Sequence, residues 1–204
     1  MTVSAAILAG GKSSRMGTNK AFLEVRNCRI IDHALDELKQ VSNDILIITN
    51  TPTEYHRFSV RVAGDIYPGF GPLSGIHAAL THAENNRLLA VACDMPFVEA
   101  NLARYLIESV KDYDVAIPVV EGYFEPLFAV YSKSCIKHIE RCMEKKKLRI
   151  IDFFSSVKVK YVKEEEISQV ADLERVFYNV NTPKELAMAK RIFKESEVSS
   201  QDSE

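Results

Sequence analysis

Residues 3–20 read VSAAILAGGKSSRMGTNK, an apolar run that passes directly into a glycine-rich loop. Apart from Ser4, residues 3–9 are apolar, without the polar alternation of a strand that has one face in water. Such a run is typical of a strand buried on both faces, as in parallel sheets with helices on either side. We therefore expect a central strand of an α/β fold here.

The rest of the chain repeats this alternation of strand and helix. Short apolar runs predict further strands at residues 45–49, 88–92, 115–117 and 127–131. Apolar residues at three- and four-residue spacings predict helices at residues 30–40, 73–83, 101–111 and 134–145, and Thr182 and Pro183 begin a final helix to about Lys194. The pattern predicts a single three-layer α/β/α domain with a mostly parallel sheet. Ligands of such sheets bind beyond the carboxyl ends of the strands.

Length and composition agree with one domain and limit its partners. The chain has 204 residues, of which 47% are hydrophobic and 26% charged, and its net charge of −2 provides no broad basic surface for nucleic acid. No run has the length or flanks of a signal peptide or a membrane span, and the four cysteines form no CxxC pair. We expect a cytoplasmic protein without membrane contact, with a domain over residues 1–194 and a disordered acidic tail over residues 195–204.

The loop at residues 10–20 carries the clearest functional signal. Its three glycines allow backbone amides to approach a polyphosphate, and Arg15 and Lys20 add positive charge. A Walker loop is excluded because Gly17 is followed by Thr-Asn, and a GxGxxG dinucleotide loop is excluded because the glycines are adjacent and then widely spaced. We interpret the segment as a phosphate-binding loop of another class rather than a flexible connection.

Two further positions are candidates to bind a cation. Asp94 follows a buried strand and precedes Pro96, and Mg²⁺ takes only one or two such oxygen ligands from protein. A helix-capping aspartate is the alternative, and the neighbouring Cys93 is interpreted as a buried strand residue rather than a nucleophile. Asn179 and Asn181 point the same way in an extended segment, so either can supply a neutral oxygen. Asn181 can instead prepare the turn into the final helix.

Residues 8–20 match in full the pattern LAGGxSxRMGxxK of sugar-nucleotide and cofactor nucleotidyltransferases. Four more motifs follow in order: GPLSGI at residues 71–76, CDMPF at 93–97, EPLFA at 125–129 and NVNTP at 179–183. Together they resemble the molybdenum cofactor guanylyltransferase family over nearly the whole chain, to about Lys194. The resemblance implies a Rossmann-like nucleotidyltransferase fold and Mg²⁺-dependent transfer of GMP from GTP to molybdopterin.

The resemblance also implies roles for individual residues. Nucleotide binding falls to Leu8, Ala9, Gly10, Gly11, Lys20, Asn50, Asp65 and Asp94. Catalysis falls to Arg15, Lys20 and Asp94, and the metal ligands are Asp94 and Asn181, with Asn181 preferred to Asn179. Asp65 can accept from guanine or from ribose hydroxyls, or it can merely cap its loop. Residues 71–75 should begin a helix whose amides face the phosphates or the acceptor.

In the inferred reaction, the acceptor phosphate attacks the α-phosphorus of GTP in line and pyrophosphate leaves. Positioning and charge neutralisation then matter more than a general base. One alternative is a cytidylyltransferase for molybdopterin or another phosphorylated acceptor. Another is a non-catalytic nucleotide-binding regulator, against which Lys20, Asp94 and Asn181 argue. Molybdoenzymes or cofactor-delivery proteins are the protein partners that the resemblance implies.

Two remaining clusters have structural interpretations. Cys135, His138 and Cys142 share one helical face but have no evident fourth ligand, so an apolar stripe is preferred to a zinc site. The basic residues between positions 141 and 149 are interpreted as a solvated helix end, favourable to the helix dipole. Within that run, Arg149 is the candidate to bind an acceptor phosphate.

Overall fold

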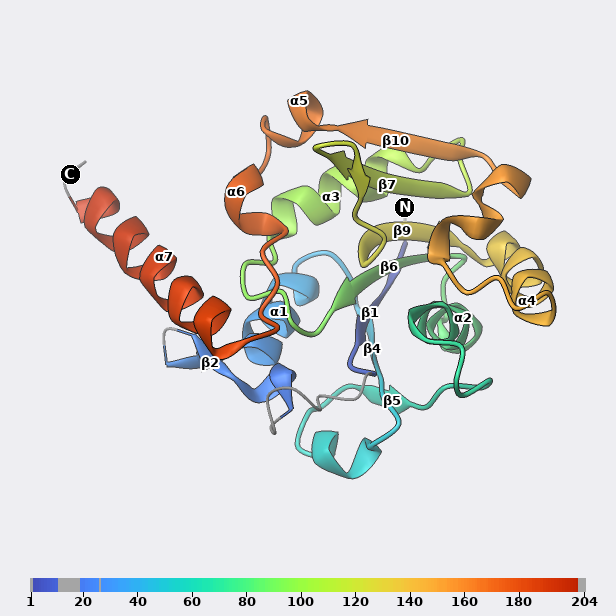
Figure 1. Cartoon of the computed structure of the whole chain (residues 1–204), viewed down its shortest axis with the longest axis horizontal. Helices are drawn as coiled ribbons and strands as arrows, with labels where there is room; N and C mark the ends of the chain where they lie inside the picture. The colour runs from blue at the N-terminus through green and yellow to red at the C-terminus, as the bar shows by residue number, and fades with distance from the viewer. Residues whose placement is uncertain (1, 11–18, 26, 202–204) are drawn as a thin grey trace.

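The computed structural model describes residues 2–10, 19–25 and 27–201. In this part of the chain eight strands form one sheet, in the order β10-β7-β9-β6-β1-β4-β5, with β8 paired to β7 (Figure 1). The strands are β1 Ser4–Leu8, β4 Asp44–Ile48, β5 Arg61–Ala63, β6 Arg87–Ala92, β7 Val115–Val120, β8 Tyr123–Phe124, β9 Phe128–Ser132 and β10 Val159–Lys163. A separate antiparallel pair is formed by β2 Glu24–Val25 and β3 Cys28–Arg29.

The sheet is mostly parallel, as the sequence predicts. β1 lies between β4 and β6 and is parallel to both, while β5 continues beside β4 and β10 beside β7, also in parallel. β9 is antiparallel to β6 and β7. All five predicted strands are present. The apolar run that predicts β9 does not indicate the direction of the strand, so its antiparallel pairing was not expected.

Helices cover both faces of the sheet (Figure 1). Their bounds are α1 Ile30–Lys39, α2 Pro72–His82, α3 Ala100–Ser109, α4 Ile136–Glu144, α5 Glu164–Ile167, α6 Leu173–Val176 and α7 Pro183–Gln201, with 3-10 segments η1 Lys20–Phe22, η2 Pro52–Tyr55, η3 Lys133–Cys135 and η4 Ile150–Ser156. One apolar cluster joins the sheet to α1, α3, α5 and α6, and a second joins it to α2, α4 and η4. Alternate residues of β1 enter the two clusters, which confirms the three-layer architecture.

A third apolar cluster seats the last helix on the β2–β3 pair. Leu186, Ala189 and Ile192 of α7 pack there with Val25 and Ile30. The Thr182 hydroxyl accepts from the Glu185 amide at 3.2 Å, which confirms the predicted cap. The helix continues to Gln201, beyond the predicted end near Lys194, and the division into residues 1–194 and a tail stays a prediction. Among the described residues, no helix is long and apolar enough to cross a membrane.

A buried carboxylate joins the amino ends of three strands. Asp44 begins β4, is 8% exposed, and accepts from the Ser4 hydroxyl, the Glu84 amide at 2.9 Å and the Arg61 guanidinium. Burial acts to raise the pKa of Asp44, but the three donors outweigh it and hold that pKa below its usual value. This network lies at the opposite edge of the sheet from the loops that follow the strands.

Asp44→Asn should lower the free energy of unfolding by about 1–3 kcal/mol at pH 7, because the donors lose a charged acceptor. The native pKa of Asp44 lies below its unfolded value of about 4, so its contribution is complete above that pH and is lost as the pH falls through the native pKa. Urea unfolding between pH 7 and 3 should therefore show the difference between wild type and variant shrinking on acidification. Asp36→Asn, on the exposed face of α1, is the control, and equal stability of wild type and Asp44→Asn at pH 7 would contradict the role.

Candidate active site

Polar residues lie two positions beyond the ends of three strands. Asn50 follows β4, Asp65 follows β5 and Asp94 follows β6. Because these strands are parallel to β1, the three residues are at the same carboxyl edge of the sheet as Gly10, which follows β1. The fold therefore places these residues at the carboxyl edge of the sheet, where the sequence predicts the active site.

The backbone around Asp94 is bound to two distant segments. The amide of Cys93 donates to the Leu8 carbonyl at 3.2 Å, and the Asp94 carbonyl accepts from the Val180 amide at 2.9 Å. The next helix, α3, begins at Ala100 with Glu99 as its N-cap, so Asp94 does not cap it. The helix-capping alternative is thereby removed.

The Lys20 ammonium joins the site together. Its Nζ lies 3.1 Å from Asp94 Oδ2 and 2.5 Å from Asn181 Oδ1, with the side chains of Lys20 and Asp94 about four-fifths covered. Lys20 begins η1, which is capped by the Asn19 side chain accepting from the Ala21 amide at 3.2 Å. Asn19 in turn donates to the Tyr55 hydroxyl at 2.8 Å. The segments that follow β1 and β6 and the segment that precedes α7 thus meet at the Lys20 ammonium.

Only one of the two asparagines of the NVNTP motif takes part in this cluster. Asn179 donates its amide to the Phe177 carbonyl at 2.9 Å, whereas Asn181 contacts Lys20. The backbone amide of Asn181 donates to Glu185 Oε2 at 2.6 Å, and this hydrogen bond is the main reason that the pKa of Glu185 is lowered. Glu185 escaped the sequence analysis, although Thr182-x-x-Glu185 has the spacing of a capping box.

The oxygens around Lys20 suit a hard cation. Asp94 Oδ2 and Asn181 Oδ1 both lie within hydrogen-bonding distance of the same nitrogen, so one ion could contact both. Mg²⁺ prefers such oxygens and completes its shell with phosphate and water. Among the described residues, no three His, Cys, Asp or Glu side chains converge to hold a metal ion. The residues therefore fit a magnesium ion that a phosphorylated substrate also binds, and this role stays a prediction.

Asn50 and Asp65 form a reciprocal pair beside the cluster. Asn50 Nδ2 donates to Asp65 Oδ2 at 2.9 Å, and the Asp65 amide donates to Asn50 Oδ1 at 3.1 Å. The pair closes the ends of β4 and β5, so Asp65 does stabilise its loop. Its second carboxylate oxygen accepts no hydrogen bond from the described residues, and a role in nucleotide binding stays a prediction.

The rest of the predicted nucleotide-binding loop is described only at its edges. Leu8 ends β1, and the Ala9 amide donates to the Ile48 carbonyl at 2.8 Å. A side-chain carbon at Gly10 would meet no described atom within 4 Å, so packing does not explain that glycine. Gly11 and Arg15 lie outside the described residues.

Cys93, interpreted as a buried strand residue, lies one position beyond the end of β6 and is partly buried, and a phosphate-binding role of Arg149 stays a prediction. Burial, and next the adjacent Asp94 carboxylate, raise the pKa of Cys93 to about 12, so its thiol stays protonated at neutral pH. Cys135 and Cys142 are buried in the apolar cluster of α2 and α4. The Arg149 side chain is 79% exposed and pairs with Asp152 at 2.9 Å.

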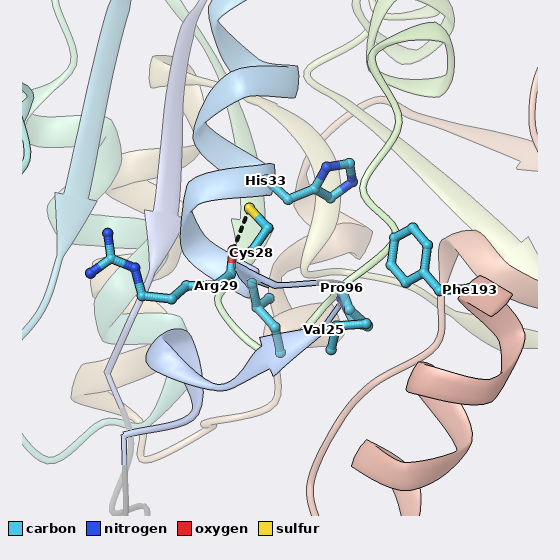
Figure 2. Close-up of a pocket in the computed structure, with 7 residues that line it drawn as sticks. Val25, Cys28, Arg29, His33, Pro96 and Phe193 are labelled. Carbon is cyan, nitrogen blue, oxygen red and sulfur yellow. Dashed lines mark hydrogen bonds between the residues drawn. The ribbon is translucent and has the colours of Figure 1, made fainter. Parts of the chain in front are cut away.

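A cavity of about 270 Å³ is lined in part by Pro96, two residues beyond Asp94, but by none of Lys20, Asp94 and Asn181. Figure 2 shows the residues that line it. Its walls are Val25, Cys28, Arg29, Ile30, His33, Pro96 and Phe193. Phe193 reaches from α7 toward His33 of α1, and the two rings are 6.5 Å apart, edge to face. Arg29 is paired with Asp32. The other walls are mostly apolar and come from both α1 and α7.

A mostly parallel α/β sheet whose carboxyl edge brings together a lysine and a carboxylate is the arrangement expected of a nucleotidyltransferase. The comparisons with known proteins agree, since residues 5–158 match the model of the MobA-like NTP transferase domain. The chain belongs to this family, and its relatives place it among the molybdenum cofactor guanylyltransferases.

Two relatives show how far the similarity extends. The probable molybdenum cofactor guanylyltransferase of Pelotomaculum thermopropionicum is 47% identical over 184 residues, which are 90% of each chain. The molybdenum cofactor guanylyltransferase of Desulfosudis oleivorans is 34% identical over 97% of this chain and 98% of its own. Asn181 and Glu185 lie beyond the family model but within the 97% of this chain that the second relative covers.

Solved structures show the same fold. The molybdopterin-guanine dinucleotide biosynthesis protein A of Archaeoglobus fulgidus superposes with a TM-score of 0.83 at 26% identity, covering 94% of this chain and 99% of its own. The 2-C-methyl-D-erythritol 4-phosphate cytidylyltransferase of Thermus thermophilus reaches 0.68 at 16% identity, over 94% and 98% of the two chains. This second similarity concerns the fold alone.

Lys20→Ala should lower the rate of nucleotidyl transfer by about 10²-fold or more, the usual effect of removing one group that stabilises the transition state. The free energy of unfolding should change by less than about 1 kcal/mol, because the ion pair is partly solvated. Steady-state kinetics and urea unfolding measure the two effects, with the exposed Lys39→Ala as control. Full activity would show that Lys20 does not act on the reaction, and an unfolded variant would show that it anchors the fold instead.

Proposed function

We propose that this protein transfers GMP from GTP to molybdopterin, with release of pyrophosphate and a requirement for Mg²⁺. The observation that carries the proposal is the convergence of Lys20, Asp94 and Asn181 at the carboxyl edge of the sheet. Relatives named molybdenum cofactor guanylyltransferase, up to 47% identical over most of the chain, support the choice of substrates. On the same basis we assign the protein to the cytoplasm.

The triphosphate is assigned to the loop that follows β1. Gly10 is exposed, and nothing described would obstruct a ligand's approach to its backbone. Helix α2 adds a second group of amides, since it begins at Pro72 after Gly71, whose φ of 63° favours glycine. The amino end of an eleven-residue helix carries partial positive charge and attracts phosphate.

Lys20 exchanges its partners when substrate binds in this proposal. Without substrate its ammonium is neutralised by Asp94 and held by Asn181. A phosphate group beside it would draw the ammonium toward the reacting phosphorus, where negative charge grows in the transition state. A magnesium ion on Asp94 and Asn181 would supply further charge neutralisation at that position.

The chain's own residues need not remove a proton in this reaction. The attacking acceptor is an anionic phosphate, so orientation and charge neutralisation are the remaining requirements. Burial raises the pKa of Cys93, the nearest thiol in sequence to Asp94, to about 12, so we assign it no covalent role. The neighbouring Asn50 and Asp65 are assigned to the nucleoside, where a carboxylate oxygen accepts from N–H groups of guanine or from ribose hydroxyls.

Asp94→Asn keeps the shape of the side chain and removes its charge, while Asp94→Ala removes both. We expect GMP transfer to fall by about 10²-fold or more in both variants, because charge at the α-phosphorus is no longer neutralised. GTP binding, measured by calorimetry, should weaken far less, since the loop amides and Lys20 remain. Near-normal magnesium-dependent turnover in Asp94→Asn would exclude the metal-ligand role.

The proposed substrates are tested by incubating the protein with molybdopterin, Mg²⁺ and each of the four NTPs. Pyrophosphate release from GTP should exceed that from CTP, ATP or UTP by at least about tenfold, because the bases differ in their hydrogen-bonding groups. A chelator such as EDTA should stop the release. Faster release from CTP would indicate a cytidylyltransferase, and no release from any nucleotide would favour a binding protein without turnover.

A further inference from the structure

Glu125 is a half-buried carboxylate without a partner in the described part of the chain. Its side chain accepts no hydrogen bond there and forms no ion pair. Burial alone raises the pKa of Glu125 above its usual value. By contrast, Asp44, Asp114 and Glu166 are acids whose donors outweigh the effect of burial and lower their pKa values. A carboxylate that the chain leaves without donors is a candidate for binding a ligand.

The backbone at Glu125 is held firmly. Its amide donates to the Pro118 carbonyl at 3.0 Å, and its carbonyl accepts from the Phe128 amide at 3.2 Å. The carbonyl of the next residue, Pro126, accepts from the buried Tyr131 hydroxyl at 2.7 Å. The position is therefore fixed although no described residue donates to the carboxylate, as expected of a group prepared for a ligand.

Glu125 belongs to the same edge of the sheet as Asp94. β9 is antiparallel to β6, so the segment that enters β9 lies where β6 ends. The Ala92 amide donates to the Leu127 carbonyl at 2.8 Å, which places Leu127 beside the strand end that leads to Asp94. Glu125 precedes Leu127 by two residues.

The strand order separates Glu125 from the proposed nucleotide site. Counting from β6, Asn50 and Asp65 lie on the side of β1, β4 and β5, whereas Glu125 lies on the side of β9 and β7. Gly10, the described start of the phosphate loop, follows β1, which lies next to β6. A nucleotide bound over β1, β4 and β5 leaves the β9 side for the acceptor, which must approach the α-phosphorus opposite the leaving pyrophosphate.

We propose that the Glu125 carboxylate binds the 2-amino-4-oxopyrimidine edge of the acceptor's pterin ring, an inference that rests on the proposed function. This edge presents a ring N–H and an amino group side by side, and a carboxylate accepts from both at once. Guanine carries the same edge, so the two substrates of the proposed reaction need two acceptors of this kind. Asp65 on one side of Asp94 and Glu125 on the other meet that need.

A neighbouring aromatic residue suits a planar ring as well. Tyr123 is 73% exposed, whereas Phe124 packs inward against Phe154 and Tyr161. Successive residues of a strand point to opposite faces, so Tyr123 and Phe124 lie on opposite faces of β8. An exposed tyrosine two residues from a carboxylate to which no described residue donates provides a stacking surface close to the hydrogen-bonding group.

The test uses the full chain, the fluorescent probe 6-hydroxymethylpterin, and GTP with Mg²⁺ as a separate ligand. Glu125→Gln presents one acceptor and one donor to a ring edge with two donors, so it should weaken binding of the pterin by about 10- to 100-fold, the loss of a hydrogen bond to a charged group. GTP binding should not change. In turnover, the KM for molybdopterin should rise more than kcat falls. Glu121→Gln, an exposed carboxylate on the same hairpin, is the control and should bind the pterin as wild type does.

Thermal unfolding separates binding from a structural role. Because burial of an unpaired carboxylate is unfavourable, Glu125→Gln should unfold at the same temperature as wild type or higher, while a structural acid would lose stability. Unchanged pterin binding in Glu125→Gln and Glu125→Ala would overturn the inference, as would a wild type that does not bind the probe. Loss of GTP binding instead would assign the carboxylate to guanine and also overturn it.

The two proposals fail in different ways. If wild type transfers GMP to molybdopterin but the Glu125 variants bind the pterin normally, the proposed function stands and this inference falls. If wild type shows no such transfer yet binds the pterin in a Glu125-dependent manner, the recognition stands and the proposed reaction falls.

Discussion

The position of β1 between two parallel neighbours is the constraint on which the site depends. Both faces of this strand are covered by helices, so its register against β4 and β6 is fixed by apolar packing on two sides. Parallel pairing sends the loops after β1, β4 and β6 to one edge. The hydrogen bond from the Cys93 amide to the Leu8 carbonyl then joins two of those loops at their origin, which brings Lys20 within 3.1 Å of Asp94.

The segment before α7 supplies the part of the site that the loops after the strands do not contain. The Val180 amide binds the Asp94 carbonyl, and the next residue, Asn181, supplies the second oxygen around Lys20. This segment is positioned by α7, whose apolar face packs on the β2–β3 pair. The glycine-rich loop and the strand-end carboxylate are therefore only part of the site. The remaining part, Asn181, lies beyond residue 158, where the match to the MobA-like domain ends.

How much the sequence predicts depends on how each element is buried. β1, β4 and β6 are buried on both faces and stand out as apolar runs, whereas β10 reads VKYVK and β5 has only three residues, so neither was predicted. Lys20, Asp94 and Asn181 were each predicted, but their meeting depends on contacts across 74 and 161 residues that no local pattern contains. The sequence places Asn179 and Asn181 on the same face of an extended segment, so only the fold shows that Asn181 is the one that contacts Lys20. Glu125 lies within a recognised motif, but the lack of a donor to it among the described residues depends on its surroundings in the fold.

The double attachment of Asn181 links the site to the folding of α7. Its side chain contacts Lys20, while its backbone amide binds Glu185 in the first turn of the helix. Thermodynamic coupling between two such events is reciprocal. A cation that binds Asn181 only in this orientation must stabilise the first turn of α7 against local unwinding. Unwinding of that turn must in return lower the affinity for the cation by the same factor. The amides of the first turn of α7 are thus expected to exchange hydrogen more slowly when the site is filled, which makes a helix end an indicator of occupancy.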